Sequence, residues 1–92
     1  MKATVTISDG EPPREYVISG SALLGRSSKS NIRLSDPAVS AKHCSIFYDE
    51  NRGFVIRDLG SSNGTFVNGK RVEGDLVLSD GDRVFLGDSS FL

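Results

Sequence analysis

The stretch GSSNGTFVNGKRV, residues 60–72, carries the clearest structural signal in the chain. Within it, Asn68 and Gly69 separate two short β-type runs, residues 65–67 and 70–72. An Asn-Gly pair between such runs is typical of a two-residue hairpin turn, because both central residues of that turn adopt a positive φ. We therefore predict an antiparallel hairpin at this point of the chain.

Short β-type runs continue on both sides of this hairpin. In residues 2–7, Ala3, Val5 and Ile7 alternate with polar residues, which is the pattern of a strand with one buried face. The expected strands are residues 2–7, 14–19, 22–24, 31–34, 42–48, 54–58, 65–67, 70–72, 76–78 and 83–86. Short strands separated by turn residues, with almost no helical pattern, predict an all-β fold, a two-sheet antiparallel β-sandwich. Residues 87–92 are expected to form a turn that leads into a last strand.

Size and composition indicate one intracellular domain. A chain of 92 residues, with 37% hydrophobic and 25% charged side chains, suits a single globular unit over residues 1–92. No apolar run approaches the roughly 18 residues of a membrane span, so we expect no membrane insertion. The opening MKATVTISDG lacks the pattern of a secretory signal, and the single cysteine, Cys44, suits a reducing compartment.

The charges are unevenly distributed along the chain. The net charge of −1 argues against direct binding of nucleic acid, which usually needs a clear basic excess. Residues 23–43, however, hold four basic side chains and one acidic one, whereas residues 73–92 hold five acidic side chains and one basic one. The first of these segments is the better candidate for holding an anion.

Three loop segments are rich in groups that bind anions: GRSS at 25–28, SAKH at 40–43 and GSSNGT at 60–65. Arginine offers a planar fork that matches phosphate oxygens, serine hydroxyls donate hydrogen bonds, and glycines let backbone N–H groups turn toward an anion. Serine and glycine also make ordinary turns, so one such loop alone indicates little. Three of them together predict a binding site for an anionic group.

The order and spacing of these motifs resemble the forkhead-associated (FHA) domain family. The resemblance rests on GR at 25–26, SxxH at 40–43, SSNGTFVNG at 61–69 and LxxGDxVxLG at 78–87, and it covers roughly residues 14–92. Members of that family fold as a two-sheet β-sandwich and recognise phosphothreonine in partner proteins through loops at one end. The resemblance therefore implies a monomeric signalling module, often one part of a longer chain, with no enzymatic activity and no cofactor.

The resemblance also implies roles for individual side chains. Arg26, which follows Gly25, matches the main phosphate-binding arginine of the family. Ser40 and Ser62 match the residues that contact the phosphate, and Asn63 matches the asparagine that hydrogen-bonds the peptide backbone. The positions that match residues supporting the loops are Gly25, His43, Gly64, Thr65 and Asn68.

One position departs from the family pattern. Ala41 stands where members often carry an arginine or asparagine that touches the ligand, so one contact is in doubt. Lys42 is the nearest replacement donor, because its flexible ammonium group can reach a phosphate, although a solvated surface lysine is an equally good interpretation.

Other interpretations of the motifs fail on context. GTFVNGKR at 64–71 fits a nucleotide-binding P-loop except at Arg71, and the predicted strand at 65–67 replaces the helix that a P-loop requires. His43 and Cys44 are adjacent on a predicted strand and point to opposite faces, so they cannot pair as nucleophile and base, and they are too few for a zinc site. The alternative that stays open is a phosphorylation-independent interaction module that binds a partner through a sheet face.

Overall fold

The computed structural model describes residues 1–8 and 12–87. These residues form ten β-strands, and they contain no helix that is long and apolar enough to cross a membrane. The strands are β1 (Lys2–Ser8), β2 (Arg14–Ser19), β3 (Ser21–Gly25), β4 (Ile32–Arg33), β5 (Cys44–Asp49), β6 (Gly53–Asp58), β7 (Thr65–Val67), β8 (Lys70–Arg71), β9 (Asp75–Val77) and β10 (Arg83–Leu86). The prediction of an all-β chain is confirmed.

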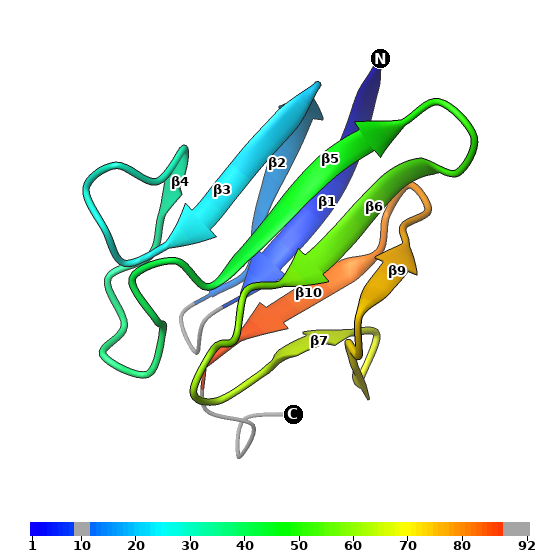
Figure 1. The fold of residues 1–92 in the computed structure, drawn as a ribbon. Coiled ribbons are helices and arrows are strands. Elements are labelled where there is room, and N and C mark those ends of the chain that lie inside the picture. The colour runs from blue at the N-terminus through cyan, green and yellow to red at the C-terminus, as the bar shows by residue number, and fades with distance from the viewer. Residues whose placement is uncertain (9–11, 88–92) are drawn as a thin grey trace.

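The strands make two five-stranded sheets that pack face to face (Figure 1). Sheet A has the order β2-β1-β10-β7-β8, and sheet B has the order β4-β3-β5-β6-β9. In Figure 1, sheet B faces the viewer, and β1 and β2 of sheet A lie behind it. The predicted two-sheet sandwich is therefore confirmed.

The core lies between the inner faces of the two sheets. In β1, Ala3, Val5 and Ile7 are buried while the residues between them are not, which confirms the alternation predicted from the sequence. The largest fully buried apolar side chains of this core are Leu24, Ile46, Ile56, Leu86, Val5 and Val84 from the two sheets and Val39 from the connection between β4 and β5. Apolar burial of this kind is the main stabilising contribution to a domain of this size.

Two strand pairs correct the expectation of a wholly antiparallel sandwich. β1 runs parallel to β10, with Thr6 opposite Arg83, and β3 runs parallel to β4, with Leu24 opposite Ile32. The other pairs are antiparallel. The alternation of a strand shows which face is buried, but it contains no information about the direction of the neighbouring strand.

The predicted hairpin is confirmed. β7 and β8 are antiparallel with Val67 opposite Lys70, and the turn between them has φ of 50° at Asn68 and 84° at Gly69. Most predicted strand ends agree with the structure within two residues; the run predicted at 31–34, for example, is reduced to β4. The last strand expected within residues 87–92 falls, beyond Gly87, outside the described residues.

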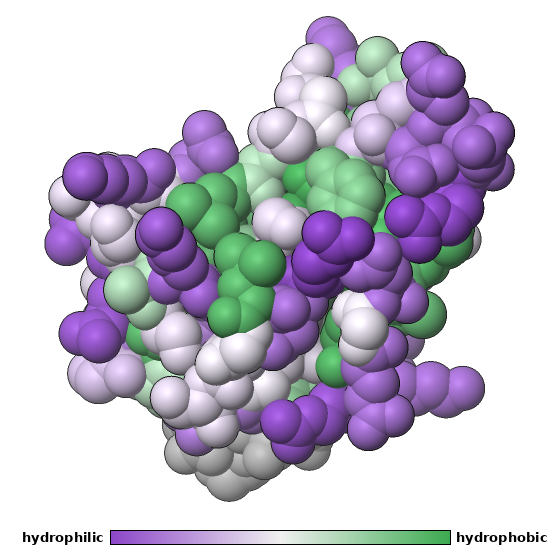
Figure 2. Space-filling view, viewed as in Figure 1, coloured by the Kyte–Doolittle hydropathy of each residue, from purple (hydrophilic) through white to green (hydrophobic). Residues whose placement is uncertain are grey.

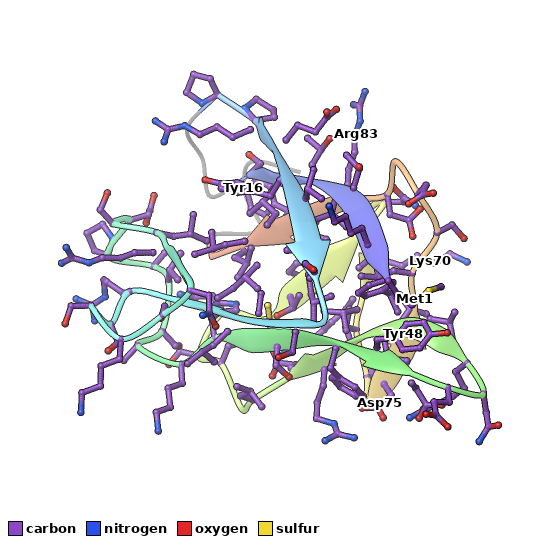
Figure 3. All side chains as sticks on the ribbon, turned by 90° about the horizontal axis from the view of Figure 1, so that it is seen from above. Met1, Tyr16, Tyr48, Lys70, Asp75 and Arg83 are labelled. Carbon is purple, nitrogen blue, oxygen red and sulfur yellow. The ribbon has the colours of Figure 1, made fainter. Side chains whose placement is uncertain are left out.

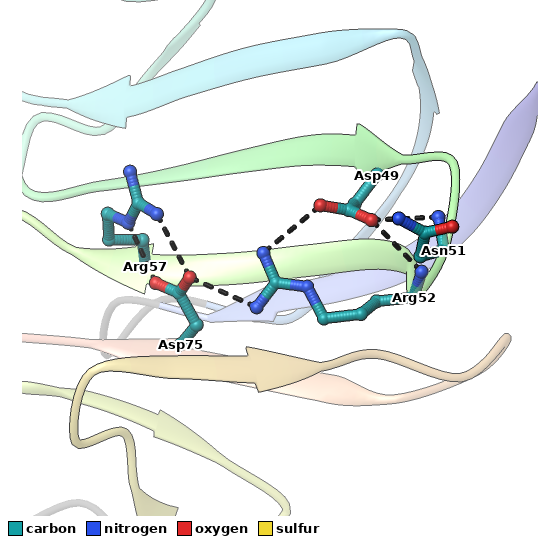
Figure 4. A network of polar contacts seen from close by, with 5 residues as sticks. All are labelled: Asp49, Asn51, Arg52, Arg57 and Asp75. Carbon is teal, nitrogen blue, oxygen red and sulfur yellow. Dashed lines mark hydrogen bonds and ion pairs between the residues drawn. The ribbon is translucent and has the colours of Figure 1, made fainter.

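The outer face of sheet B carries a network of exposed ion pairs (Figure 4). Arg57 binds Asp75 through Nε at 2.7 Å, and Arg52 bridges Asp75 and Asp49 at 3.3 and 3.2 Å. The hydrogen bond from Arg57 is the main reason why the pKa of Asp75 falls to about 2. Such exposed pairs contribute little to stability. Their main consequence is that these two arginines are already neutralised.

Apolar side chains share this outer face with the ion pairs. Figure 2 shows them gathered in the middle of the face, with hydrophilic side chains around them. Val55 belongs to this face, since its register partners are Phe47 and Val77, and it is fully buried. The Arg57 guanidinium lies 5.0 Å above the centre of the Phe47 ring and covers part of the apolar surface.

Truncating a core side chain tests this description of the fold. We expect Ile56→Ala to lower the free energy of unfolding by about 2–5 kcal/mol, because it removes buried methyl groups and leaves a cavity. Val17→Ala, at a side chain that is 63% exposed, is the matched control and is expected to change stability by less than about 0.5 kcal/mol. Urea titration measures both, and equal effects would contradict the placement of the core.

Candidate functional site

Three connections meet at one end of the sandwich, at the lower left of Figure 1. The first, residues 26–31, follows β3; the second, residues 34–43, joins β4 to β5; the third, residues 59–64, joins β6 to β7. We call this region the loop end. All three loop segments singled out in the sequence lie there.

Backbone hydrogen bonds join the first connection to the second. Arg26 N–H donates to the Ser40 carbonyl at 3.0 Å, and Ser27 N–H donates to the Ala41 carbonyl at 3.1 Å. This close approach requires glycine at position 25, because a Cβ there would lie 2.1 Å from the Ala41 carbonyl oxygen. Gly25 therefore sets the separation of the two connections.

The Arg26 side chain is oriented by the second connection. Its Nε donates to the Val39 carbonyl at 3.0 Å. The terminal nitrogens Nη1 and Nη2 make no hydrogen bond or ion pair within residues 1–8 and 12–87, and the side chain is exposed. A guanidinium held by Nε with both terminal nitrogens available is suited to bidentate contact with an anion.

Side chains of the site join the second connection to the third. Ser62 N–H donates to Ser40 Oγ at 3.1 Å, and Asn63 Nδ2 donates to the Ala38 carbonyl at 2.8 Å. Because Ser40 Oγ accepts this bond, its own hydroxyl hydrogen is left to donate elsewhere. Asn63 Oδ1 is left as an acceptor in the same way.

His43 holds the same two connections together from below. Its side chain is fully buried; Nδ1 accepts a hydrogen bond from Ser40 N–H at 3.0 Å, and Nε2 lies 2.7 Å from the Gly64 carbonyl oxygen. With Nδ1 accepting, Nε2 must carry the proton and donate to Gly64. Burial lowers the pKa of His43, and this outweighs the opposing effects of the Gly64 carbonyl and Asp58, so the neutral ring is favoured.

Asp58 organises the third connection, and sequence reasoning did not assign it a role. Its carboxylate accepts hydrogen bonds from Gly60 N–H, Ser61 N–H and Thr65 Oγ1, and from Ser61 Oγ at 2.5 Å. Burial alone would raise the pKa of Asp58, but these hydrogen bonds outweigh burial and lower it. The signal in the sequence is an acidic residue at a strand end, two residues before the pair Gly60-Ser61, because such residues cap turns.

The structure brings together most of the side chains singled out in the sequence. Arg26, Ser40, Ser62 and Asn63 share the loop end through the hydrogen bonds described above, and Gly25, His43, Gly64 and Thr65 lie directly beneath them. Lys42, also at the loop end, is exposed.

Asn68 lies elsewhere. It sits in the β7–β8 turn, where its Oδ1 accepts from Arg83 N–H and its Nδ2 donates to Asp82, both at 3.0 Å. These bonds attach the hairpin to the start of β10 rather than to the three connections.

The electrostatics of the loop end favour an anion. Within the described residues, every ion pair involves Asp49 or Asp75 on sheet B, so neither Arg26 nor Lys42 is neutralised by a carboxylate. Asp58, the acidic residue nearest to the third connection, has its oxygens occupied by donors from its own turn. The described residues contain no cluster of three or more metal-ligating side chains.

A substitution at Gly25 tests the contact between the first two connections. We expect Gly25→Ala to lower the free energy of unfolding by about 1–3 kcal/mol, because the new Cβ would force the Ala41 carbonyl away. The matched control is Ser28→Ala, at an exposed neighbour, which we expect to change stability by less than about 0.5 kcal/mol. Urea titration measures both, and an unaffected Gly25→Ala protein would show that the two connections are not in contact.

The pH dependence of stability tests the role of His43, which is the only histidine in the chain. Because its pKa is lowered in the folded state, the unfolded state binds the proton first as the pH falls below the ordinary value of 6.5. We expect the free energy of unfolding to be highest above that pH and to fall below it, by at most about 1.4 kcal/mol per pH unit. Urea titrations from pH 8 to 5.5 measure this, with His43→Gln as the control that loses the dependence; stability that rises on acidification would contradict the assignment.

Comparison with known proteins agrees with this geometry. The family model for the FHA domain matches residues 22–87. The FHA domain-containing protein FhaA of Mycobacterium tuberculosis is 35% identical over 97% of this chain, which spans 16% of that protein. A solved structure from a study of phosphothreonine-dependent FHA domain interactions has a TM-score of 0.76 and 35% identity, and the match covers 95% of this chain and 88% of that one.

A further solved structure is that of M. tuberculosis EmbR in complex with a low-affinity phosphopeptide. It has a TM-score of 0.72 and 32% identity, and the match covers 89% of this chain and 22% of that one. The fold, the family model and the relatives agree, and the chain belongs to the FHA domain family.

Proposed function

We propose that this domain is a phosphothreonine-dependent interaction module that binds phosphorylated segments of partner proteins at the loop end. The observation that carries this proposal is the junction at Ser40. Its backbone carbonyl accepts a hydrogen bond from Arg26 N–H, and its hydroxyl oxygen accepts one from Ser62 N–H. Ser40 therefore joins the backbone of Arg26 in the first connection to the backbone of Ser62 in the third.

The donors that remain at this junction suit a phosphate. Arg26 retains two terminal nitrogens, and Ser40 retains its hydroxyl hydrogen. A phosphorylated side chain carries a charge near −2 and several acceptor oxygens, and each charge-assisted hydrogen bond to it is worth roughly 1.5–3 kcal/mol. Asn63 lies beside these donors with Oδ1 available, so a peptide N–H is the natural partner of its carboxamide.

The module acts by binding, without making or breaking a bond. Cys44 cannot serve as a nucleophile, because burial raises the pKa of its thiol to about 12. His43 has both ring nitrogens engaged in hydrogen bonds that hold the loops. A Ser-His-Asp site would have to use His43, and a Cys-His site would have to use both residues.

We also propose the setting in which this domain acts. The chain spans 16% of FhaA and 23% of EmbR, so the activities of those whole proteins are not transferred to it. A single monomeric domain that acts inside the cell on a phosphorylated protein agrees with the free, buried Cys44 and with the position of the site on one set of loops.

Removing the arginine tests the proposal. We expect Arg26→Ala to weaken binding of a phosphothreonine peptide by tenfold to more than a hundredfold, because a charge-assisted contact to the phosphate is lost. Isothermal titration calorimetry measures the affinity, and circular dichroism confirms that the variant is folded. Arg83→Ala, on the outer face of sheet A, is the matched control and should bind normally (Figure 3).

Treatment of the peptide with phosphatase completes this experiment. The proposal requires that dephosphorylation abolish binding to the wild-type domain. Binding that survives dephosphorylation, or an Arg26→Ala protein of unchanged affinity, would instead favour an interaction through a sheet face.

A further inference from the structure

A recess opens at the loop end, between one edge strand of sheet A and one edge strand of sheet B. β2 is the edge of sheet A, and β4 is the edge of sheet B. The recess has a volume of about 70 Å³, and its lining residues are Ile7, Pro12, Arg14, Tyr16, Arg33, Leu34 and Ser35. Part of its lining is polar, and two of its residues are arginines.

The register of β2 explains why an arginine reaches this recess. Arg14 lies opposite Ile7, and Tyr16 lies opposite Val5, and both partners are core residues on the inner face of β1. Arg14 therefore continues the inward-facing row of β2, at the point where the apolar core ends. Tyr16 of this row is partly buried and packs against the apolar core.

The second arginine enters from sheet B. Arg33 belongs to β4, and its Nε donates to the Arg26 carbonyl at 3.2 Å. The next residue, Leu34, donates its N–H to the Gly25 carbonyl at 2.9 Å. These two hydrogen bonds attach the sheet B side of the recess to Gly25, the last residue of β3, and to Arg26, the first residue of the first connection.

Among the described residues, no carboxylate compensates the charge in this recess. Its lining contains two guanidinium groups and no carboxylate. Within the described ranges, neither Arg14 nor Arg33 forms an ion pair, whereas Arg52 and Arg57 on sheet B are paired with carboxylates. The two positive charges beside this recess repel each other. A bound anion would offset this repulsion, because it attracts both guanidinium groups.

The recess is within reach of a peptide whose phosphate is bound by Arg26. Figure 1 shows β4 at one side of the loop end and the connection after β6, which carries Asn63, at the other. Arg33 is hydrogen-bonded to the Arg26 carbonyl, and an extended peptide advances about 3.3–3.6 Å per residue, so a residue close to the phosphothreonine can reach the neighbourhood of Arg33.

We propose that Arg14 and Arg33 form a second anion subsite, which binds a carboxylate or phosphate group of the same partner segment on the side of the phosphothreonine away from Asn63. Tyr16 and Ser35 supply hydroxyl groups, and Ile7 and Leu34 form the apolar floor. This inference rests on the proposed function. It assigns to the domain a preference for partners with an acidic or a second phosphorylated residue near the phosphothreonine.

A peptide scan tests the subsite. The parent peptide carries one phosphothreonine among alanines, and glutamate or a second phosphothreonine is then placed singly at each of the five positions on either side. We expect a gain in affinity of about three- to tenfold at positions on one side only, and loss of that gain in Arg14→Gln. Arg83→Gln is the matched control and should retain the gain. The glutamate and phosphothreonine series show which anion is preferred.

Two outcomes overturn the subsite while leaving the proposed function intact. Either the parent peptide binds in an Arg26-dependent manner and no added anion improves affinity, or the improvement is the same in Arg14→Gln. Arg33→Gln is a supporting variant only, because Arg33 also contacts the Arg26 backbone.

A second measurement decides the case in which the parent peptide does not bind. Inorganic phosphate is titrated into the Arg26→Ala protein while the Nε–Hε NMR signals of Arg14 and Arg33 are recorded. Saturable shifts of both signals, absent from a sodium chloride titration of equal ionic strength, support the subsite. Signals that do not move overturn it, whatever the peptide does.

Discussion

The buried imidazole of His43 is the interaction on which the loop end depends. It accepts a hydrogen bond from Ser40 N–H and donates one to the Gly64 carbonyl, so it fixes the separation between the second and third connections. Ser40 and Ser62 can meet above it only because this separation is set. A neutral ring with one donating and one accepting nitrogen is the only form that satisfies both bonds, and burial favours that form.

The proposed site consists of side chains that use one hydrogen bond for structure and leave another hydrogen-bonding group available to a ligand. Arg26 is held by Nε, Ser40 by its acceptor oxygen and Asn63 by its amide nitrogen. Each group is thereby oriented before a ligand arrives, which reduces the entropy lost on binding. The tightly bonded turn around Asp58 and the close contact at Gly25 have the same effect on the backbone.

The hydrogen-bonding side chains of the proposed site could be predicted from the sequence, but the atoms that orient them could not. Arg26, Ser40 and Asn63 were recognisable because their residue types and spacing are informative. The groups that position them include the carbonyls of Ala38 and Val39, and any residue can supply a carbonyl. The role of Asp58 could not be predicted, because its partners are backbone N–H groups and hydroxyls of its own turn.

In the fold, too, features set by neighbouring residues could be predicted, whereas contacts between residues far apart in the sequence could not. The alternation in β1 and the Asn-Gly turn at residues 68–69 are local, and both predictions are confirmed. The parallel pairing of β1 with β10 joins residues almost the whole chain apart, and no local pattern encodes it. The inward orientation of Arg14 is likewise visible only from the register of β2 on β1, and for that reason the recess between β2 and β4 could not be predicted.

A double-mutant cycle between Arg26 and Ser40 tests the central claim most directly. Affinity for a phosphothreonine peptide is measured by calorimetry for the wild type, Arg26→Ala, Ser40→Ala and the double variant. If both side chains contact one phosphate, the losses are not additive, and the coupling free energy is about 0.5–3 kcal/mol. Additive losses, or single variants that bind as tightly as the wild type, would contradict the account.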